Sequence, residues 1–274
     1  MEKAKEQTFS QKQEMLVKQL KEETKNPVCL ALSGGVDSSL LAALIGKCAA
    51  ENGTKAYGVT FDTVLHPAAD MEAARKAAEE GRLLHKVITV NELEFDTIKK
   101  NPKDRCYICK KGLFQKLKAF AEDHGISMIY EGSNYDDLSQ YRPGMRAVKE
   151  LGISSPLLEH GLTKKEIREW ASQLGISSAS RPSSPCMATR LPYGEELNLF
   201  NLRRIEAAEE ALKELGFGVI RVRLHKDVAR LEIPVEQLSQ AVEQAVLIKN
   251  ILKALDFRYI TLDLEGFRSG SMDI

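Results

Sequence analysis

The residues from Ser33 to Ser39, Ser-Gly-Gly-Val-Asp-Ser-Ser, have the types and spacing that bind a phosphate, and we call this stretch the phosphate loop. They follow an apolar run, Val28 to Leu32, that predicts a buried strand, and they open a helical pattern. Glycine lets the backbone approach an anion, and the N–H groups of a helix start point toward it. We predict that four residues form the cradle: Ser33, Gly34, Gly35 and Ser38. Asp37 is placed to hold a magnesium ion, and the loop is not a Walker loop because no Gly-Lys-Ser/Thr follows.

Cys106 and Cys109 form a CxxC motif, Arg-Cys-Tyr-Ile-Cys-Lys-Lys, at the start of a predicted helix. A helix N-terminus and neighbouring cations favour the thiolate form of cysteine. The residues alone leave four interpretations open: a thioredoxin-like redox pair, half of a zinc site, part of an iron–sulfur site, or two inert thiols. The sequence has no second CxxC and no histidine pair at ligand spacing to complete a zinc site. The place of the motif in the chain also fits a thioredoxin pair poorly.

Cys186 lies in a polar loop, Ser-Ser-Pro-Cys-Met-Ala-Thr-Arg, close to Arg190. Loops often carry reactive groups, and a nearby guanidinium favours a thiolate. The alternative is a loop cysteine packed against the second domain. Cys29 and Cys48 differ, because one falls in an apolar strand and the other in an Ala-rich helix. They are predicted to be small buried hydrophobic side chains.

Arg221 and Arg223 alternate on a predicted strand, so both side chains leave the same face. Paired guanidinium groups suit a phosphate because each donates two parallel hydrogen bonds. The alternative is a solvated sheet face whose charge is balanced by acids such as Glu232.

The elements that must position these residues alternate between strand and helix in the first part of the chain. Strands are predicted near 28–32, 56–61, 85–90 and 126–131. Helices are predicted near 8–24, 37–51, 68–82 and 108–123. This order predicts an α/β fold, a parallel sheet with helices on both faces, whose ligands bind at the carboxyl ends of the strands.

A polar segment and a helix at 163–174 come next, the helix opened by a capping box of Thr163 and Glu166. The Ser-, Pro- and Arg-rich loop 177–194 marks the expected boundary between domains 1–180 and 181–274. The second domain is predicted to be a small α+β unit. Its helices fall near 196–215 and 235–254, and its strands near 219–224, 228–233 and 258–264.

Composition narrows the class of protein. The 274 residues hold 39 Lys+Arg and 39 Asp+Glu, and a zero net charge weighs against a nucleic-acid partner. No apolar run is long enough to span a membrane, and the N-terminus lacks a signal core. Five cysteines, an odd number, fit a reducing compartment. We therefore expect a cytoplasmic protein with neither a membrane nor a nucleic-acid partner.

Together these motifs resemble the LarE family of ATP-dependent sulfur transferases, in the ATP pyrophosphatase (PP-loop) superfamily. The phosphate loop marks only the superfamily, whereas the segments 185–194 and 259–272 are more specific. The matching segments run through almost the whole chain in family order: 33–39, 105–111, 141–147, 155–157, 163–168, 185–194, 221–234 and 259–272.

The resemblance implies an enzyme that adenylates a carboxylate of a pyridinium dicarboxylate mononucleotide, using ATP and Mg²⁺, and replaces AMP with sulfur during synthesis of the nickel-pincer nucleotide. It implies a nucleotide substrate, a sulfide or other sulfur donor, and a homo-oligomer. It assigns catalytic roles to Cys186, Glu209 and Arg190. Arg190, Arg221 and Arg223 become candidates for contacts with the substrate phosphate or the adenylate.

Family members with one active-site cysteine, the match of Cys186, sacrifice its sulfur. This chain departs from that pattern, because it also has Cys106 and Cys109. It resembles a three-cysteine branch, in which three thiolates hold a 4Fe–4S cluster and leave one iron open for a replaceable sulfide. The rival functions are a PP-loop tRNA thiolase, a non-enzymatic ATP-binding iron–sulfur sensor and an ammonia-using synthetase. The neutral net charge weighs against the tRNA thiolase.

Overall fold

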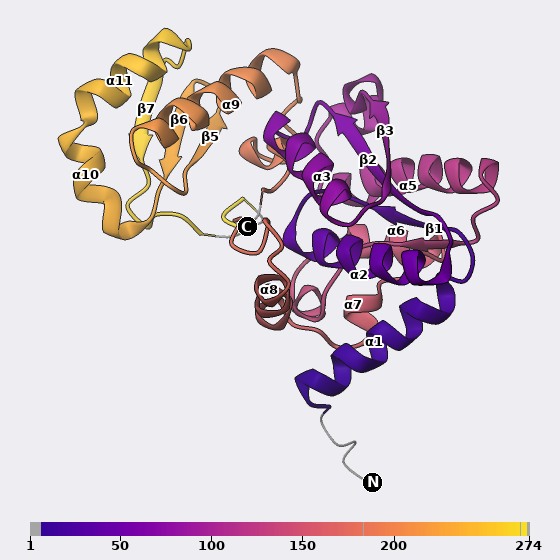
Figure 1. The fold of residues 1–274 in the computed structure, drawn as a ribbon. Helices are drawn as coiled ribbons and strands as arrows, with labels where there is room; N and C mark the ends of the chain where they lie inside the picture. Colours follow the sequence, from indigo (N-terminus) through magenta and orange to yellow (C-terminus); the bar gives the residue numbers. More distant parts are fainter. Residues whose placement is uncertain (1–6, 183, 269, 273–274) are drawn as a thin grey trace, which may run out of the picture. The chain divides into compact units, whose positions relative to one another are not determined.

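A computed structural model describes residues 7–182, 184–268 and 270–272. The chain forms two compact units, coloured along the sequence in Figure 1. Unit 1 consists of Met1–Thr63, Ala68–Val90 and Cys106–Ser184, and unit 2 of Val64–Pro67, Asn91–Arg105 and Pro185–Ile274. The chain passes from unit 2 to unit 1 between Arg105 and Cys106, and from unit 1 to unit 2 between Ser184 and Pro185. The CxxC motif and Cys186 thus each lie in sequence next to a boundary between the units.

Unit 1 is built on a four-stranded parallel sheet in the order β3-β2-β1-β4. Its strands are β1 (Val28–Ala31), β2 (Ala56–Thr63), β3 (Leu84–Val90) and β4 (Met128–Tyr130). In β1 alternate residues face opposite sides, so Leu30 and Cys29 enter different cores. The predicted α/β fold with helices on both faces is confirmed, and the phosphate loop follows the central strand β1.

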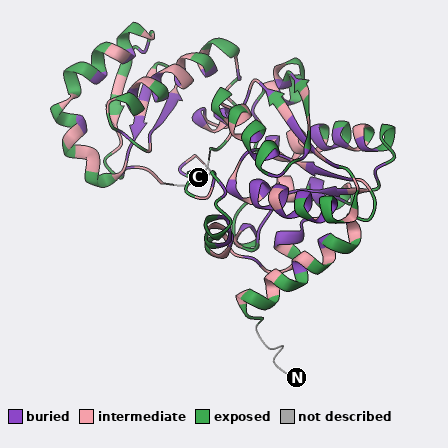
Figure 2. Cartoon of the chain, in the orientation of Figure 1, coloured by how far each residue is buried: buried purple, intermediate pink, exposed green. Residues whose placement is uncertain are grey.

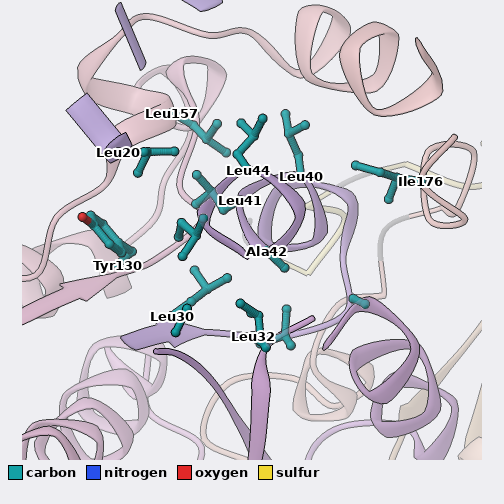
Figure 3. Packing of buried hydrophobic residues seen from close by; sticks show 14 of the residues in the cluster. Leu20, Leu30, Leu32, Leu40, Leu41, Ala42, Leu44, Tyr130, Leu157 and Ile176 are labelled. Carbon is teal, nitrogen blue, oxygen red and sulfur yellow. The ribbon is translucent and has the colours of Figure 1, made fainter. Parts of the chain in front are cut away.

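Helices cover each face of this sheet. One core surrounds α2 (Val36–Asn52), which is apolar on most sides and packs with α1 (Phe9–Glu23), α3 (Ala68–Glu80), α7 (Pro156–Glu159) and α8 (Lys164–Gln173). Figure 3 shows Ala42 on the side of α2 that faces Leu30 and Leu32 at the sheet, and Leu44 on the opposite side, next to Leu157 from α7. The second core lies under α5 (Arg105–Asp123) and α6 (Gly144–Glu150). A 3-10 turn, η2 (Tyr135–Ser139), follows β4.

Unit 2 contains a three-stranded mixed sheet, β5 (Arg221–His225), β6 (Val228–Glu232) and β7 (Tyr259–Leu262). Strands β5 and β6 are antiparallel, and β6 and β7 are parallel. Helix α9 (Leu199–Glu214) packs on β5, and α11 (Ala245–Ala254) packs on α9. Short turns complete the unit: η1 (Glu92–Glu94), α4 (Asp96–Lys99) and η3 (Met187–Arg190). Figure 2 shows that β5 and most of β6 are buried, whereas the residues of β7 are exposed or half-buried.

Two local details test the helix predictions. The capping box of α8 is confirmed, because Thr163 accepts from the Glu166 N–H and Glu166 accepts from the Thr163 N–H. The single helix predicted over 235–254 is wrong. It is divided into η4 (Val235–Gln237), α10 (Leu238–Glu243) and α11, with a break at Gln244, whose ψ of 13° departs from the helical value. In the described part of the chain, no helix is both long and apolar enough to cross a membrane.

Candidate active site

The phosphate loop joins the end of β1 to the start of α2, and one of its positions requires glycine. Gly34 has a φ of +73°, in the left-handed region that other residues rarely adopt. A Cβ on Gly34 would lie 2.5 Å from the backbone nitrogen of Ala74 in α3, which is too close for two such atoms. Gly35, the N-cap of α2, has no side chain to cap the helix, so the first N–H groups of α2 are available to an anion.

Hydroxyl groups and a second close backbone approach complete the loop. The Oγ atoms of Ser33 and Ser38 lie 3.1 Å apart, and the Gly35 N–H points at the Ser33 Oγ over 3.4 Å. Gly132, just after β4, comes so near that a Cβ there would lie 3.1 Å from the nitrogen of Ser38. The four predicted cradle residues thus lie together in one turn. N–H and O–H groups gathered in one glycine-rich turn fit a pyrophosphate group.

Asp37 points from the first turn of α2 toward polar side chains from distant parts of unit 1. Its carboxylate pairs with Lys164, the first residue of α8, and accepts a 3.4 Å hydrogen bond from the side-chain amide of Asn134. The backbone N–H of Lys164 donates to Asp136 at 2.8 Å, which anchors the lysine near the loop. Carboxylate oxygens are ligands that Mg²⁺ prefers. In the structure the ammonium group of Lys164 balances the charge of this carboxylate. The magnesium role of Asp37 stays a prediction.

The CxxC helix α5 is joined to the end of β4 by a half-buried ion pair. The Nζ of Lys110 lies 2.9 Å from an oxygen of Glu131, which also accepts hydrogen bonds from Ser133 and Ser155. Burial acts to raise the pKa of Glu131, but Lys110 and the hydroxyl donors outweigh it and hold the pKa below its usual range. Because Gly132 follows Glu131 and approaches the phosphate loop, Lys110 links the CxxC turn to that loop.

Cys106 and Cys109 lie in the first turn of α5 and are both partly buried. Residues three apart share one face of a helix, so the two thiols form a pair that suits zinc or an iron–sulfur cluster. Within the described ranges, no three His, Cys, Asp or Glu side chains form a group that would hold a metal ion. The cluster therefore stays a prediction.

Cys29 and Cys48 lie in the two cores of unit 1, with exposures of 0% and 3%. Burial raises the pKa of the Cys29 thiol to about 12, and it also raises the pKa of Cys48. Their prediction as small buried hydrophobic side chains is confirmed.

The segment Pro185–Gly194, which we call the Cys186 segment, is held by a buried arginine. Arg190, only 2% exposed, donates to the carbonyl oxygens of Pro185 at 2.9 Å and Cys186 at 3.3 Å. The other edge of its guanidinium pairs with both carboxylate oxygens of Glu209 on α9, at 2.9 and 2.8 Å. This two-bond pairing fixes the turn that carries Cys186 to the helix beneath it.

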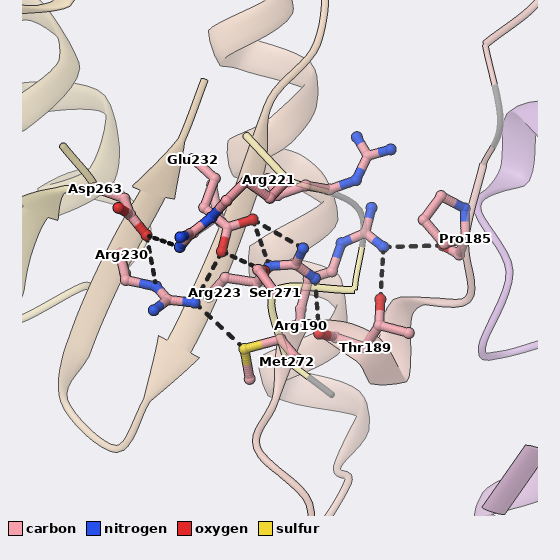
Figure 4. Close-up of polar contacts among 12 residues, drawn as sticks. Pro185, Thr189, Arg190, Arg221, Arg223, Arg230, Glu232, Asp263, Ser271 and Met272 are labelled. Carbon is pink, nitrogen blue, oxygen red and sulfur yellow. Dashed lines mark hydrogen bonds and ion pairs between the residues drawn. The ribbon is translucent and has the colours of Figure 1, made fainter. Parts of the chain in front are cut away.

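Of the predicted arginine pair on β5, Arg223 reaches the same segment, as Figure 4 shows. Arg223 donates to the carbonyl oxygen of Thr189 at 2.8 Å and pairs with Glu232 at 2.8 Å. Burial, and then the charge of Arg190, lower the pKa of Arg221 to about 10. Because Arg221 and Arg223 are 7% and 4% exposed, the alternative of a solvated sheet face is wrong. In unit 2 the backbone of Cys186 thus lies beside Arg190, and Arg190, Glu209, Arg221 and Arg223 lie close to one another.

Four residues near the phosphate loop were not singled out from the sequence: Glu131, Gly132, Lys164 and Arg181. Three of them carried a signal. Glu131 ends a predicted strand and Gly132 follows it, at the same edge of the sheet as the loop, and Lys164 follows a capping residue at the start of a predicted helix. The residues that they contact lie far away in sequence, as Asp37 does from Lys164 and Gly34 from Arg181, so no local pattern predicted these contacts.

Known proteins are similar to this chain over most of its length. The asparagine synthase family matches residues 13–107. A protein of Lactiplantibacillus plantarum named pyridinium-3,5-bisthiocarboxylic acid mononucleotide synthase is 34% identical over 97% of this chain and 95% of its own length. The chain belongs to the LarE family. Uncharacterized relatives in this family occur in Synechocystis, 36% identical over 89% of this chain and 91% of the relative, and in Methanocaldococcus jannaschii, 34% identical over 95% and 99%.

Membership of the LarE family makes the chain an enzyme of the transferase class with the PP-loop fold. The parallel sheet, with the loop after its central strand, is the architecture that this superfamily requires. The superfamily implies the use of ATP and Mg²⁺, and the likeness supports a role in sulfur transfer for cofactor biosynthesis.

Proposed function

We propose that this LarE-family enzyme adenylates a carboxylate of a pyridinium dicarboxylate mononucleotide and then replaces AMP with sulfur, which yields a thiocarboxylate. The observation that carries the proposal is the phosphate loop, with a left-handed Gly34 and the start of α2 facing the Ser33 and Ser38 hydroxyls. The relative in L. plantarum is named for a bisthiocarboxylic acid mononucleotide, which such a sulfur insertion would produce.

In the first step a carboxylate oxygen attacks the α-phosphorus of ATP, and the bond from that phosphorus to pyrophosphate breaks. The N–H groups and hydroxyls of the phosphate loop stabilise the departing pyrophosphate, and Asp37 would hold the magnesium ion. In the second step a sulfur nucleophile attacks the acyl carbon, and AMP leaves. Positioning and charge stabilisation carry most of this chemistry.

Unit 2 supplies the groups for the second step. Cys186 lies on a turn fixed by Arg190 and Glu209, and we assign it to sulfur transfer. Arg221 is buried close to the charges of Arg190 and Arg223, and burial and these charges lower its pKa, so a phosphate group of the substrate would relieve that repulsion. We assign Arg221, together with Arg223 on the same face of β5, to that phosphate.

Exchange of labelled pyrophosphate into ATP tests the adenylation. We expect exchange only when the dicarboxylate mononucleotide and Mg²⁺ are present, because the adenylate forms reversibly. The D37N variant should lose most of this exchange, whereas D123N, at the exposed end of α5, should retain it. Release of ADP and phosphate instead of AMP and pyrophosphate would contradict the proposal.

The sulfur is proposed to come from a 4Fe–4S cluster held by Cys106, Cys109 and Cys186. Three soft thiolates suit such a cluster, and the CxxC pair supplies two of them from one helix face. When bound, the cluster would supply a replaceable sulfide in place of the sulfur of Cys186.

Anaerobic reconstitution followed by an iron and sulfide assay tests this ligand set. We expect about four irons per chain in the wild type and in C48A, whose thiol is buried in a core, and a large loss in C106A. Iron-free protein, or dehydroalanine at position 186 after turnover, would contradict the cluster and favour sacrifice of Cys186.

A further inference from the structure

Arg181 joins the phosphate loop to α3 from a segment far along the chain. Its Nη1 donates to the carbonyl oxygen of Gly34 at 3.1 Å. Its Nη2 donates to the carbonyl oxygen of Ala69 at 3.2 Å and pairs with Asp70 at 2.7 Å. All four residues belong to unit 1, and the side chains of Arg181 and Asp70 are only 25% and 14% exposed. One guanidinium therefore bridges the loop and the helix against which Gly34 is packed.

The bond to Gly34 sets the orientation of the peptide between Gly34 and Gly35. In a trans peptide the C=O and N–H groups point in opposite directions, and the described chain contains no cis peptide. With its oxygen turned to Arg181, this peptide directs the Gly35 N–H toward the Ser33 hydroxyl, 3.4 Å away. That distance makes a weak bond, which a phosphate oxygen would replace at little cost.

The backbone that carries Arg181 is itself anchored. Arg168 on α8 donates to the carbonyl oxygens of Ala179 at 2.5 Å and Arg181 at 2.9 Å. The Arg181 side chain thus reaches the loop from a fixed base, and little conformational entropy is lost when ATP binds. Arg75, an exposed arginine on α3, is held differently, because it pairs with Glu72 and Glu79 of its own helix.

We propose that Arg181 is a positioning residue for the β- and γ-phosphates of ATP. It holds the Gly34 carbonyl oxygen away from the phosphate site and so keeps the Gly35 N–H turned toward that site. Without it the peptide is free to rotate, and a carbonyl oxygen facing the anion opposes binding. The inference rests on the proposed use of ATP by this loop, and it assigns a role to a residue outside the SGGVDSS motif.

Calorimetric binding of inorganic pyrophosphate with Mg²⁺ tests the proposal without requiring turnover. The R181Q variant should bind pyrophosphate about ten- to a hundredfold more weakly than wild type, the usual effect of losing a charged hydrogen bond. R181K should recover only part of the affinity, because a single ammonium cannot replace the planar fork. R75Q, which removes the exposed arginine from α3, should bind like wild type.

Kinetics of pyrophosphate exchange separate positioning from a general structural effect. R181Q should raise the KM for ATP by the same factor and leave kcat at saturating ATP nearly unchanged, with a melting temperature close to that of R75Q. Pyrophosphate affinity equal to wild type in R181Q, or full recovery in R181K, overturns the proposal. If wild type binds pyrophosphate but never exchanges it into ATP, the proposed adenylation is wrong. The comparison of pyrophosphate affinities between wild type and R181Q still tests the role of Arg181.

Discussion

The phosphate loop of unit 1 and the Cys186 segment of unit 2 are held in place by different means. The loop depends mainly on backbone geometry, because Gly34 has a left-handed φ and Gly35 opens a helix. The Cys186 segment instead rests on side chains, because Arg190 and Arg223 donate to its carbonyl oxygens and pair with Glu209 and Glu232. We therefore expect an added side chain to disrupt the phosphate loop, and the loss of a charged side chain to disrupt the Cys186 segment.

The sharpest test of the backbone site is the substitution G34A. A Cβ at this position meets the backbone of α3 and also strains a φ of +73°, so we expect the loop to deform and ATP-dependent activity to fall at least a hundredfold. The control is G53A, because Gly53 has a φ of +66° but a Cβ added there would meet no atom within 4 Å. Pyrophosphate exchange measured for both variants separates the clash from the strain. Equal activity in G34A and G53A would break the comparison.

The matching test of the ion-paired site is R190L. Removal of one partner from a buried pair leaves Glu209 charged and desolvated, at a cost of about 3–5 kcal/mol in the free energy of unfolding. We expect the melting temperature to fall by roughly 10 °C, measured by calorimetry. R203Q removes an exposed arginine from α9 and should change the melting temperature very little. A melting temperature of R190L equal to that of R203Q would contradict the comparison.

Within unit 1 an ion pair also lies near the backbone site, because Lys110 pairs with Glu131 just before Gly132, and pH tests its role. Because the pKa of Glu131 is lowered by folding, its carboxylate stabilises the fold above the unfolded pKa of about 4.3, and this stabilisation is lost as pH falls through the folded pKa. The difference in unfolding free energy between wild type and E131Q should therefore be largest near neutral pH and shrink in acid. Urea unfolding across pH measures it.

E150Q is the matched control for this pH series. Glu150 pairs at the surface with Lys111, the residue next to Lys110 on α5. Solvent screens that pair, so its removal should leave the stability profile close to wild type. A difference between wild type and E131Q that stays constant down to acid pH would contradict the role assigned to the Glu131 charge.

The sequence predicted the parts of the molecule that depend on neighbouring residues. The strand before Ser33, the capping box at Thr163 and the alternation of strand and helix are all local patterns, and the structure confirms them. Arg181 and Lys164 were missed, because their partners Gly34 and Asp37 lie far away in sequence. The helix break at Gln244 was also missed, because neither Gly nor Pro marks it.

Buried charge was the hardest feature to predict. Arg221 and Arg223 alternate on a strand in the same way as arginines on a solvated face do. Only the fold shows that both are buried and that Glu232 accepts from Arg223. Side-chain alternation gives the face on which residues lie, whereas the elements packed on that face decide whether water reaches it.

The central claim is that ATP is cleaved to AMP and pyrophosphate in order to place sulfur on a carboxylate. The most direct measurement is a single reaction with ATP, Mg²⁺, sulfide and the dicarboxylate mononucleotide, analysed by mass spectrometry together with quantified AMP. The account predicts a thiocarboxylate product formed in equal amount to AMP. AMP release without a sulfur-containing product, or a thiocarboxylate formed in the absence of ATP, would contradict it.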